Sequence, residues 1–401
     1  MKAAPRSPWE VFKAFLFMGA TSFGGPAAGL GSLEAEFARR REWVTPEKAR
    51  ELLTWAKLLP GPVVTQFAIL LGRETGGASN GIAAGMGFVI PAILLVGILS
   101  VLGEAGGQSP VFRAAFEGGI LGALAVVAVS VVDLSRGQLS DRWRWMAFFA
   151  AGVMAALFPR VEPLLIFGGG LWSAWRTSET GAAPDDGEGT TQIPTGFWLF
   201  TIAFTSLLFL PPSLVSTKVP QIFQICLRAA AMTFGTGMAV LPVLRSEFID
   251  HHQWLTTAQF SLGLALGQVT PGPMVITAAA LGFAVARWPG FAAGALGIFL
   301  PSFLNALLFI PAVKLRIRSP QRMAAFVSGA FPWVLGALAA AGLVLGAQIL
   351  RGEGETAFFT PAFWVRAGVF LVLFGGIIRF RPPSWAVIVG MGLLSLTRFF
   401  F

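Results

Sequence analysis

The residues best suited to chemistry in this 401-residue chain form a Pro-Gly-Pro element that occurs twice within apolar sequence. Pro60-Gly61-Pro62 is followed 211 positions later (271 − 60 = 211) by Pro271-Gly272-Pro273. Proline removes a backbone donor and glycine permits unusual dihedral angles, so each element predicts a broken helix. A helix that restarts after a break presents free N–H groups and about half a unit of positive charge, which suits an anion.

Polar side chains accompany these breaks, and a second pair of breaks is expected at Gly24-Gly25-Pro26 and Gly235-Thr236-Gly237. Hydroxyls and amides can donate to an oxyanion at lower desolvation cost than a buried ammonium. Lys57 aligns with Gln268, so a fixed cation is present in one copy only, and snorkelling of Lys57 is the alternative. The candidate substrate-binding residues are Ser22, Gly24, Gly25, Lys57, Pro60, Gly61, Pro62, Thr65, Gln66, Thr233, Gly235, Thr236, Gln268, Pro271, Gly272 and Pro273.

Three carboxylates are candidates for proton coupling. Glu36 and Glu247 are 211 positions apart, and a Trp follows each by seven positions. A structural role in the connecting loop is the alternative for both. Glu117 lies in an apolar run, where a proton relay competes with pairing to Arg113, one helical turn away.

No cofactor or metal site is expected. His251 and His252 lie in a polar loop without ligand partners at metal spacing, which predicts that they are solvated. The single cysteine, Cys226, excludes a CxxC site. The chain contains no GxxxxGK[ST], HExxH or GxSxG motif, so an enzyme is not expected.

Composition places these residues in a membrane protein. The chain is 55% hydrophobic and 12% charged, whereas soluble domains carry about 25% charge. Its net charge of +9 comes from bases in short loops between apolar runs, which indicates membrane topology and not a nucleic-acid surface. The expected spans are 11–33, 49–71, 81–102, 111–132, 143–158, 163–175, 197–214, 222–244, 257–286, 290–310, 324–350, 363–378 and 385–396.

The spans form two copies of one pattern. We expect a first repeat at 1–176, a polar linker at 177–196, an additional span at 197–214 and a second repeat at 220–401. Thr45 and Thr256 are expected to cap the helices that lead into the two Pro-Gly-Pro elements.

Loop charge predicts that the two repeats have opposite orientations. The loop after the first span is rich in bases at 39–50, whereas its counterpart in the second repeat carries little beyond Arg245. The turn at 103–113 has only Arg113, whereas its counterpart has four bases at 314–322. The positive-inside rule therefore favours inverted repeats, and the count of crossings requires a broken or re-entrant helix at each Pro-Gly-Pro element.

These motifs resemble the chromate ion transporter family in its long, two-domain form. The resemblance rests on SFGGPAAGLGSLEAEF and EWVTPEKARELLTWAKLLPGPVVTQFAILLG in the first half and on TFGTGMAVLPVLRSEF and GQVTPGPMVITAAALG in the second. It implies a multi-pass protein of the bacterial inner membrane that exports chromate, driven by membrane potential or a proton gradient. Thr236-Gly237 replaces Gly25-Pro26 in the second copy, so the copies are expected to contribute unequal contacts.

The sequence thus predicts an all-α polytopic membrane protein with two inverted repeats and broken helices. Its expected function is secondary transport of chromate, bound between the halves. The alternatives are transport of sulfate or another tetrahedral oxyanion, including uptake, and a non-transporting membrane scaffold. The expected partners are a small oxyanion and the lipid bilayer, without nucleic acid, and the oligomeric state stays open.

Overall fold

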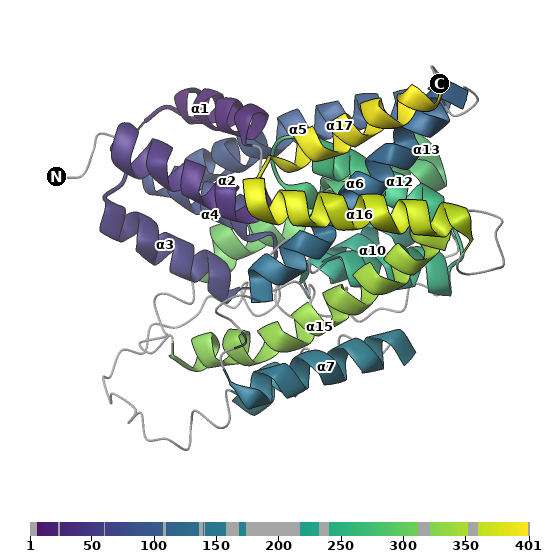
Figure 1. The fold of residues 1–401 in the computed structure, drawn as a ribbon. Helices are drawn as coiled ribbons and strands as arrows, with labels where there is room; N and C mark the ends of the chain where they lie inside the picture. The colour runs from purple at the N-terminus through teal and green to yellow at the C-terminus, as the bar shows by residue number, and fades with distance from the viewer. Residues whose placement is uncertain are drawn as a thin grey trace.

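The computed structural model describes residues 6–22, 25–59, 61–106, 110–135, 139, 141–157, 168–173, 217–231, 240–311, 321–351 and 360–399. All regular elements in these ranges are helices (Figure 1). Within them, four helical stretches are long and apolar enough to cross a membrane, namely Ala78–Glu104, Met274–Phe309, Ser328–Arg351 and Pro361–Phe380. These features confirm an all-α polytopic membrane protein. The predicted linker and the additional span at 197–214 lie outside the described residues.

The first half runs from α1 to α7. Its elements are α1 (Pro8–Thr21), α2 (Gly25–Glu34), the π-helix η1 (Ala35–Arg40), α3 (Pro46–Leu58), α4 (Val63–Glu74), α5 (Ala78–Gly106), α6 (Pro110–Ser135) and α7 (Arg142–Leu157).

The second half repeats much of this order. Its elements are α10 (Lys218–Ala231), α11 (Val240–Arg245), the π-helix η5 (Ser246–His251), α12 (Thr257–Val269), η6 (Met274–Ile276), α13 (Thr277–Leu304), η7 (Asn305–Phe309), α15 (Gln321–Arg351), α16 (Pro361–Phe380), α17 (Ser384–Ser395) and η8 (Leu396–Phe399).

Threonine caps start the two helices that precede the breaks, as predicted. The Thr45 hydroxyl accepts a hydrogen bond from the Lys48 amide at 3.2 Å, and Pro46 occupies the first turn of α3. Thr256 and Gln259 form a reciprocal capping box at the start of α12. Each cap satisfies amide groups that have no acceptor within the helix, so the chain enters each helix at a defined residue.

Both Pro-Gly-Pro elements separate helices. α3 ends at Leu58 and α4 begins at Val63, whereas α12 ends at Val269 and η6 begins at Met274. Gly61 and Gly272 have φ values of 127° and 93°, which lie in the region that favours glycine. α3 and α4 have 13 and 12 residues. Each is therefore about 20 Å long, too short for a hydrocarbon core of about 30 Å.

Two further divisions of the helices fall where the sequence predicted a break or a boundary. The stretch 11–33 contains two helices, because α1 ends at Thr21 and α2 begins at Gly25. The expected boundary between 257–286 and 290–310 coincides with a junction at Ala286 and Arg287, where the backbone inside α13 (Thr277–Leu304) is not helical. Arg287 has a φ of 56° there, and Gly77, with a φ of 84°, occupies the matching turn of the first half (287 − 77 = 210).

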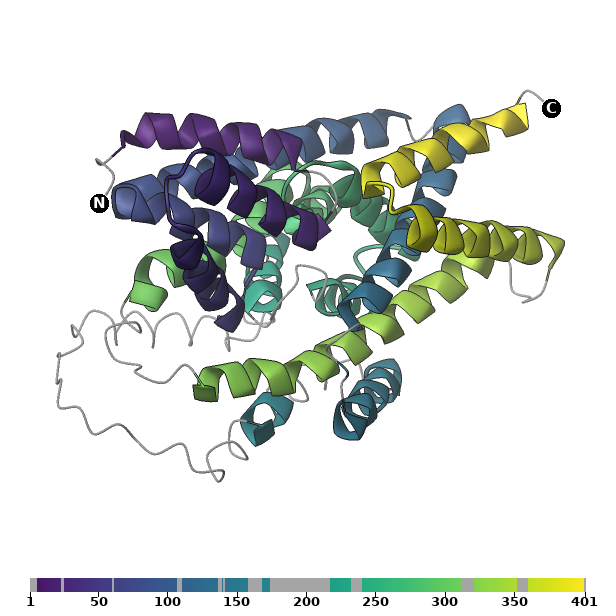
Figure 2. The ribbon, with the colours of Figure 1, turned by 60° about the vertical axis from the view of Figure 1, so that its left-hand side comes forward.

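The two halves are interlocked. α1 packs along α5, and α10 packs along α13. However, α7 packs on α15 of the other half, and α16 and α17 pack on α6 (Figures 1 and 2). Glycines allow these close approaches, since a side-chain carbon at Gly118 would clash with the Met391 carbonyl, and one at Gly336 would clash with the Phe148 carbonyl.

The core is shared by both halves. One continuous apolar cluster includes fully buried phenylalanines from each, namely Phe15, Phe37, Phe67, Phe88, Phe248 and Phe260. This shared core fixes how the two broken helices meet.

Candidate functional site

The two Pro-Gly-Pro turns border one small cavity between the halves. Its lining consists of Ser22, Gly29, Pro62, Val63, Val64, Phe88, Gly272, Pro273, Met274 and Val275. None of these described lining residues is charged. The cavity volume is about 20 Å³, which accommodates about one water molecule. A tetrahedral oxyanion therefore fits only after the turns move apart.

Two helix N-termini face this cavity. Pro62 precedes α4 and Pro273 precedes η6, and no side chain caps either start. The Gln66 amide is the first to bond back to Pro62, at 3.0 Å, and the Ile276 amide bonds to Pro273 at 3.1 Å. The amides just before them lack an acceptor in their own helix, so both starts present N–H groups and positive dipole ends.

Each turn rests on the long helix of the opposite half. The Gly272 amide donates to the Ser22 carbonyl at 2.9 Å, and a side-chain carbon at Gly272 would lie 3.4 Å from Ala92 Cβ in α5. A side-chain carbon at Gly61 would lie 3.5 Å from Ser302 Oγ in α13. Ala92 and Ser302 each follow a proline within their helix. The contacts are thus reciprocal between the halves.

Buried hydroxyls without a hydrogen-bond partner in the described structure lie at and near the turns. They belong to Ser22, Thr65 and Ser302, whose exposed fractions are 8%, 0% and 0%. Ser22 lines the cavity. A buried hydroxyl left without a partner costs about 1–3 kcal/mol, and native proteins keep few of them. These hydroxyls are suited to a ligand that accepts hydrogen bonds.

The structure brings together part of the predicted site. Ser22, Pro62, Gly272 and Pro273 line the cavity. The other described candidates near the turns are Gly61, Thr65, Gln66, Gln268 and Pro271, all buried. Gly25 begins α2, farther along the first break. Gly24, Pro60, Thr233, Gly235 and Thr236 lie outside the described residues.

Lys57 lies apart from this cavity. It is exposed on the last turn of α3 and is absent from the lining. The cavity geometry therefore gives no support to Lys57 as the fixed cation for a dianion, and its exposure favours the snorkelling alternative.

Sequence reasoning missed the residues that close the cavity from neighbouring elements. Phe88 of α5, Gly29 of α2 and Met274 of η6 line it. Ser302 was also missed, although Pro301 aligns with Pro91 at a spacing of 210. A search for polar residues beside these matched prolines would have found Ser302.

Glu36 is clamped by arginines on the π-helix η1. Its carboxylate accepts hydrogen bonds from Arg41 Nε at 2.6 Å and Arg40 Nη1 at 3.0 Å. Burial acts to raise the pKa of Glu36, but the hydrogen bonds and charges of Arg41 and Arg40 outweigh it and leave the pKa below its usual value. The Arg41 guanidinium also lies over the Trp43 ring, 5.4 Å from its centroid.

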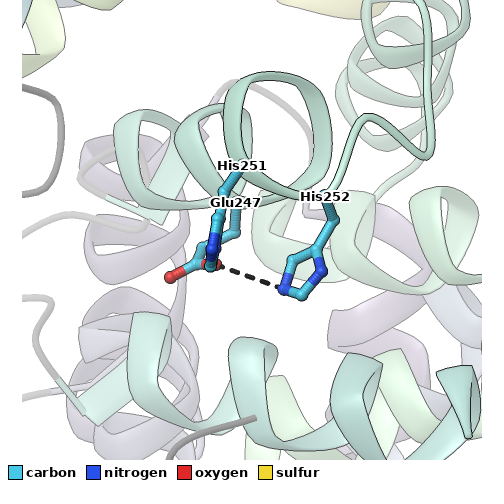
Figure 3. Close-up of side chains that lie close together, drawn as sticks. All are labelled: Glu247, His251 and His252. Carbon is cyan, nitrogen blue, oxygen red and sulfur yellow. Dashed lines mark hydrogen bonds and ion pairs between the residues drawn. The ribbon is translucent and has the colours of Figure 1, made fainter. Parts of the chain in front are cut away.

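Glu247 has a different environment on the π-helix η5. His251 Nδ1 lies 3.1 Å from its carboxylate oxygen and His252 Nε2 lies 3.6 Å from the same oxygen (Figure 3). The expectation that these histidines have no partner at metal spacing is wrong, because the potential ligand atoms of all three residues lie within 4.8 Å of one another. The π-helical backbone brings them together, which sequence spacing alone did not reveal.

Glu117, the third coupling candidate, is exposed on α6 and does not line the cavity. A second cavity of about 240 Å³ lies between α5, α12 and α13. Its lining includes Ser100 and the ion pair of Glu104 with Arg287, so its lining is charged, unlike that of the first cavity.

A multi-pass helical protein whose broken helices converge on a cavity between two halves has the construction of a secondary transporter. The family model for chromate transporters matches residues 9–174 and 220–396. The chain therefore belongs to the chromate transporter family, in agreement with the resemblance seen in its motifs.

Curated relatives agree with this placement. The chain is 30% identical over 353 residues to a probable chromate transport protein of Synechococcus elongatus, covering 85% of each chain. It is 28% identical to chromate transport proteins of Cupriavidus metallidurans and Pseudomonas aeruginosa. Those matches cover 82% and 91% of this chain and 80% and 86% of the relatives. No solved structure matches the chain significantly.

Proposed function

We propose that this protein is a secondary transporter that exports chromate across the bacterial inner membrane and is not an enzyme. The family and the names of the relatives support chromate as the substrate. The observation that carries the proposal is the convergence of both Pro-Gly-Pro helix starts on one uncharged cavity.

The cavity suggests how a dianion is held. Free amides at Val63 and Val64 and at Met274 and Val275 approach the oxyanion from two directions, and the Ser22 hydroxyl adds a donor. Because the site binds through dipoles and hydroxyls, the substrate does not have to separate from a fixed countercharge in each transport cycle. The substrate can therefore leave once the site opens.

We propose inverted repeats and alternating access for the movement itself. The bond from the Gly272 amide to the Ser22 carbonyl joins the two halves across the cavity. Separation of the turns enlarges the cavity, and rocking of one half against the other exposes it to alternate sides. The dependence of chromate transport on a proton gradient, measured in Glu36, Glu117 and Glu247 variants, shows which of these carboxylates couples protons to transport.

The membrane potential supplies a physical reason for export. Moving one charge across 100 mV is worth about 2.3 kcal/mol, so a dianion gains about 4.6 kcal/mol when it leaves an inside-negative cell. Uptake of the dianion would have to work against the same electrical energy, which requires that cations be transported with it. Efflux therefore needs no coupling ion at all.

The test is uptake of labelled chromate into inverted membrane vesicles that contain the protein. An interior-positive potential should drive accumulation, and dissipating that potential should abolish it. Excess sulfate reports selectivity between tetrahedral dianions. Failure to exceed vesicles without the protein, with and without an imposed gradient, would overturn the proposal.

A further inference from the structure

The two π-helices carry the same arrangement with different chemistry. In η1 the partners of Glu36 stand four and five positions later (40 − 36 = 4; 41 − 36 = 5), and both are arginines. In η5 the partners of Glu247 stand at the same two offsets (251 − 247 = 4; 252 − 247 = 5), and both are histidines. The arginines are permanently charged, whereas a neutral imidazole is a metal ligand.

The aromatic support is repeated as well. Arg41 lies over Trp43 in the first half. His252 stacks on Trp254 in the second, with ring centroids 4.3 Å apart and an angle of 23° between the planes. This stacking fixes the plane of the His252 ring while its Nε2 faces Glu247 (Figure 3). The His252 side chain is therefore held in a fixed orientation at the position that Arg41 occupies in the first half.

The distances match those of a metal centre. Zinc lies about 2.0–2.1 Å from nitrogen or carboxylate ligands, so neighbouring ligand atoms of a tetrahedron are about 3.3 Å apart. Here the two nitrogen–oxygen distances are 3.1 and 3.6 Å, and all three ligand atoms lie within 4.8 Å of one another. Small rotations of the side chains would complete the geometry.

The surroundings also suit a cation. The exposed side-chain fractions are 16% for His252, 22% for Glu247 and 45% for His251, which leaves one side open for a water ligand. Arg245, the base on the preceding turn, is bonded to Asp250 at 2.8 Å.

We propose that Glu247, His251 and His252 bind a divalent transition-metal cation of the zinc class, with water as the fourth ligand. A site of two imidazoles and one carboxylate binds such cations in preference to magnesium or calcium. The bound metal replaces the charge that Arg40 and Arg41 supply in the first half. It joins η5 to the turn before α12, the helix that leads to Pro271-Gly272-Pro273.

The experiment measures Zn²⁺ binding to the purified full-length protein in detergent, with an affinity tag that contains no histidine. Isothermal titration should show one site per chain, and Zn²⁺ should raise the melting temperature. Glu247→Gln and His251→Ala should each weaken binding by at least about tenfold. A Co²⁺-loaded sample should show the intense visible absorption of tetrahedral cobalt.

The matched control is the double variant His251→Arg and His252→Arg, which copies the clamp of the first half. It should fold, because the same backbone already holds two arginines around Glu36. It should neither bind Zn²⁺ nor be stabilised by it. The proposal is overturned if the wild-type protein binds no more Zn²⁺ than this variant, or if Glu247→Gln binds Zn²⁺ as tightly as the wild type.

Discussion

The first half of the chain holds Glu36 between two arginines, whereas the second half holds Glu247 against two histidines. The backbone around them is nearly the same. Glu42 and Gln253 both have a φ of 51°, at a spacing of 211 (253 − 42 = 211), and a π-helix precedes each. The halves thus share a chain path, while the partners of the carboxylate are permanently charged arginines in one half and histidines in the other.

The two Pro-Gly-Pro turns also share a backbone geometry but differ in their neighbouring groups. Gly61 lies near the Ser302 hydroxyl, whereas Gly272 lies near the methyl group of Ala92 and the carbonyl of Gly19. The turn geometry is repeated, but one turn has a side-chain hydroxyl as a neighbour and the other has a methyl group and a backbone carbonyl. This difference supports the expectation that the two halves make unequal contacts with a substrate.

The largest effect is expected from Gly272→Leu or Gly61→Leu, which should abolish chromate transport while the protein stays in the membrane. Each position has a positive φ, so a side chain costs about 1–2 kcal/mol in backbone strain and also fills the space between the halves. Chromate uptake into vesicles measures transport, and the amount of protein in the membrane fraction measures whether the variant is still inserted.

Gly77→Leu is the matched control for these two substitutions. Gly77 has a φ of 84° but nothing within 4 Å of an added side-chain carbon. It should therefore carry the same backbone strain and retain transport. Normal transport in Gly272→Leu, or equal loss in Gly77→Leu, would contradict the assignment of the turns to the site.

The next effect concerns the cavity hydroxyl. Ser22→Ala should raise the KM for chromate roughly tenfold or more, because a hydrogen bond to a charged group is worth about 1.5–3 kcal/mol. Thermal stability should not fall, since Ser22 Oγ has no partner in the described structure. Ser261 is also buried and without a partner, but it lies outside the cavity. Ser261→Ala should therefore leave the KM unchanged, and an equal rise in both variants would count against the site.

The interactions of Glu36 and Glu247 should contribute differently to the stability of the folded protein. Glu36→Gln removes a buried charge that two arginines hold, and we expect a loss on the order of 1 kcal/mol. Glu247→Gln should cost less in metal-free protein, because its partners are histidines. Melting temperatures in one detergent at neutral pH, with a chelator present, compare the two. A larger loss for Glu247→Gln would reverse the comparison.

The smallest effect is the acid dependence of the first clamp. The pKa of Glu36 is lowered from its usual 4.5 in the folded protein. Its ion pairs therefore contribute fully above pH 4.5, and their contribution is lost as pH falls through the lower folded value. The melting-temperature difference between wild type and Glu36→Gln should be flat down to about pH 4.5 and then shrink. A difference that shrinks already near neutral pH would contradict this sign.

The local sequence around the breaks predicted where the helices begin and end. Thr45 and Thr256 begin the helices, and proline and glycine end them, for reasons that act within a few residues. The glycines at 61 and 272 follow directly, because no other residue adopts a positive φ there at low cost. The partners that complete the cavity, such as Phe88 and Ser302, could not be derived from these local patterns.

The sequence by itself determined the helical membrane class, the two copies of the motif, the family and the positions of both breaks. These depend on hydrophobicity, spacing and residue type, which are local properties. Only the tertiary structure decided that Gly272 bonds to Ser22, that α7 lies on α15 and α17 on α6, and that two histidines gather around Glu247. Such contacts depend on how the two halves pack and on how a π-helix turns, and a linear spacing specifies neither.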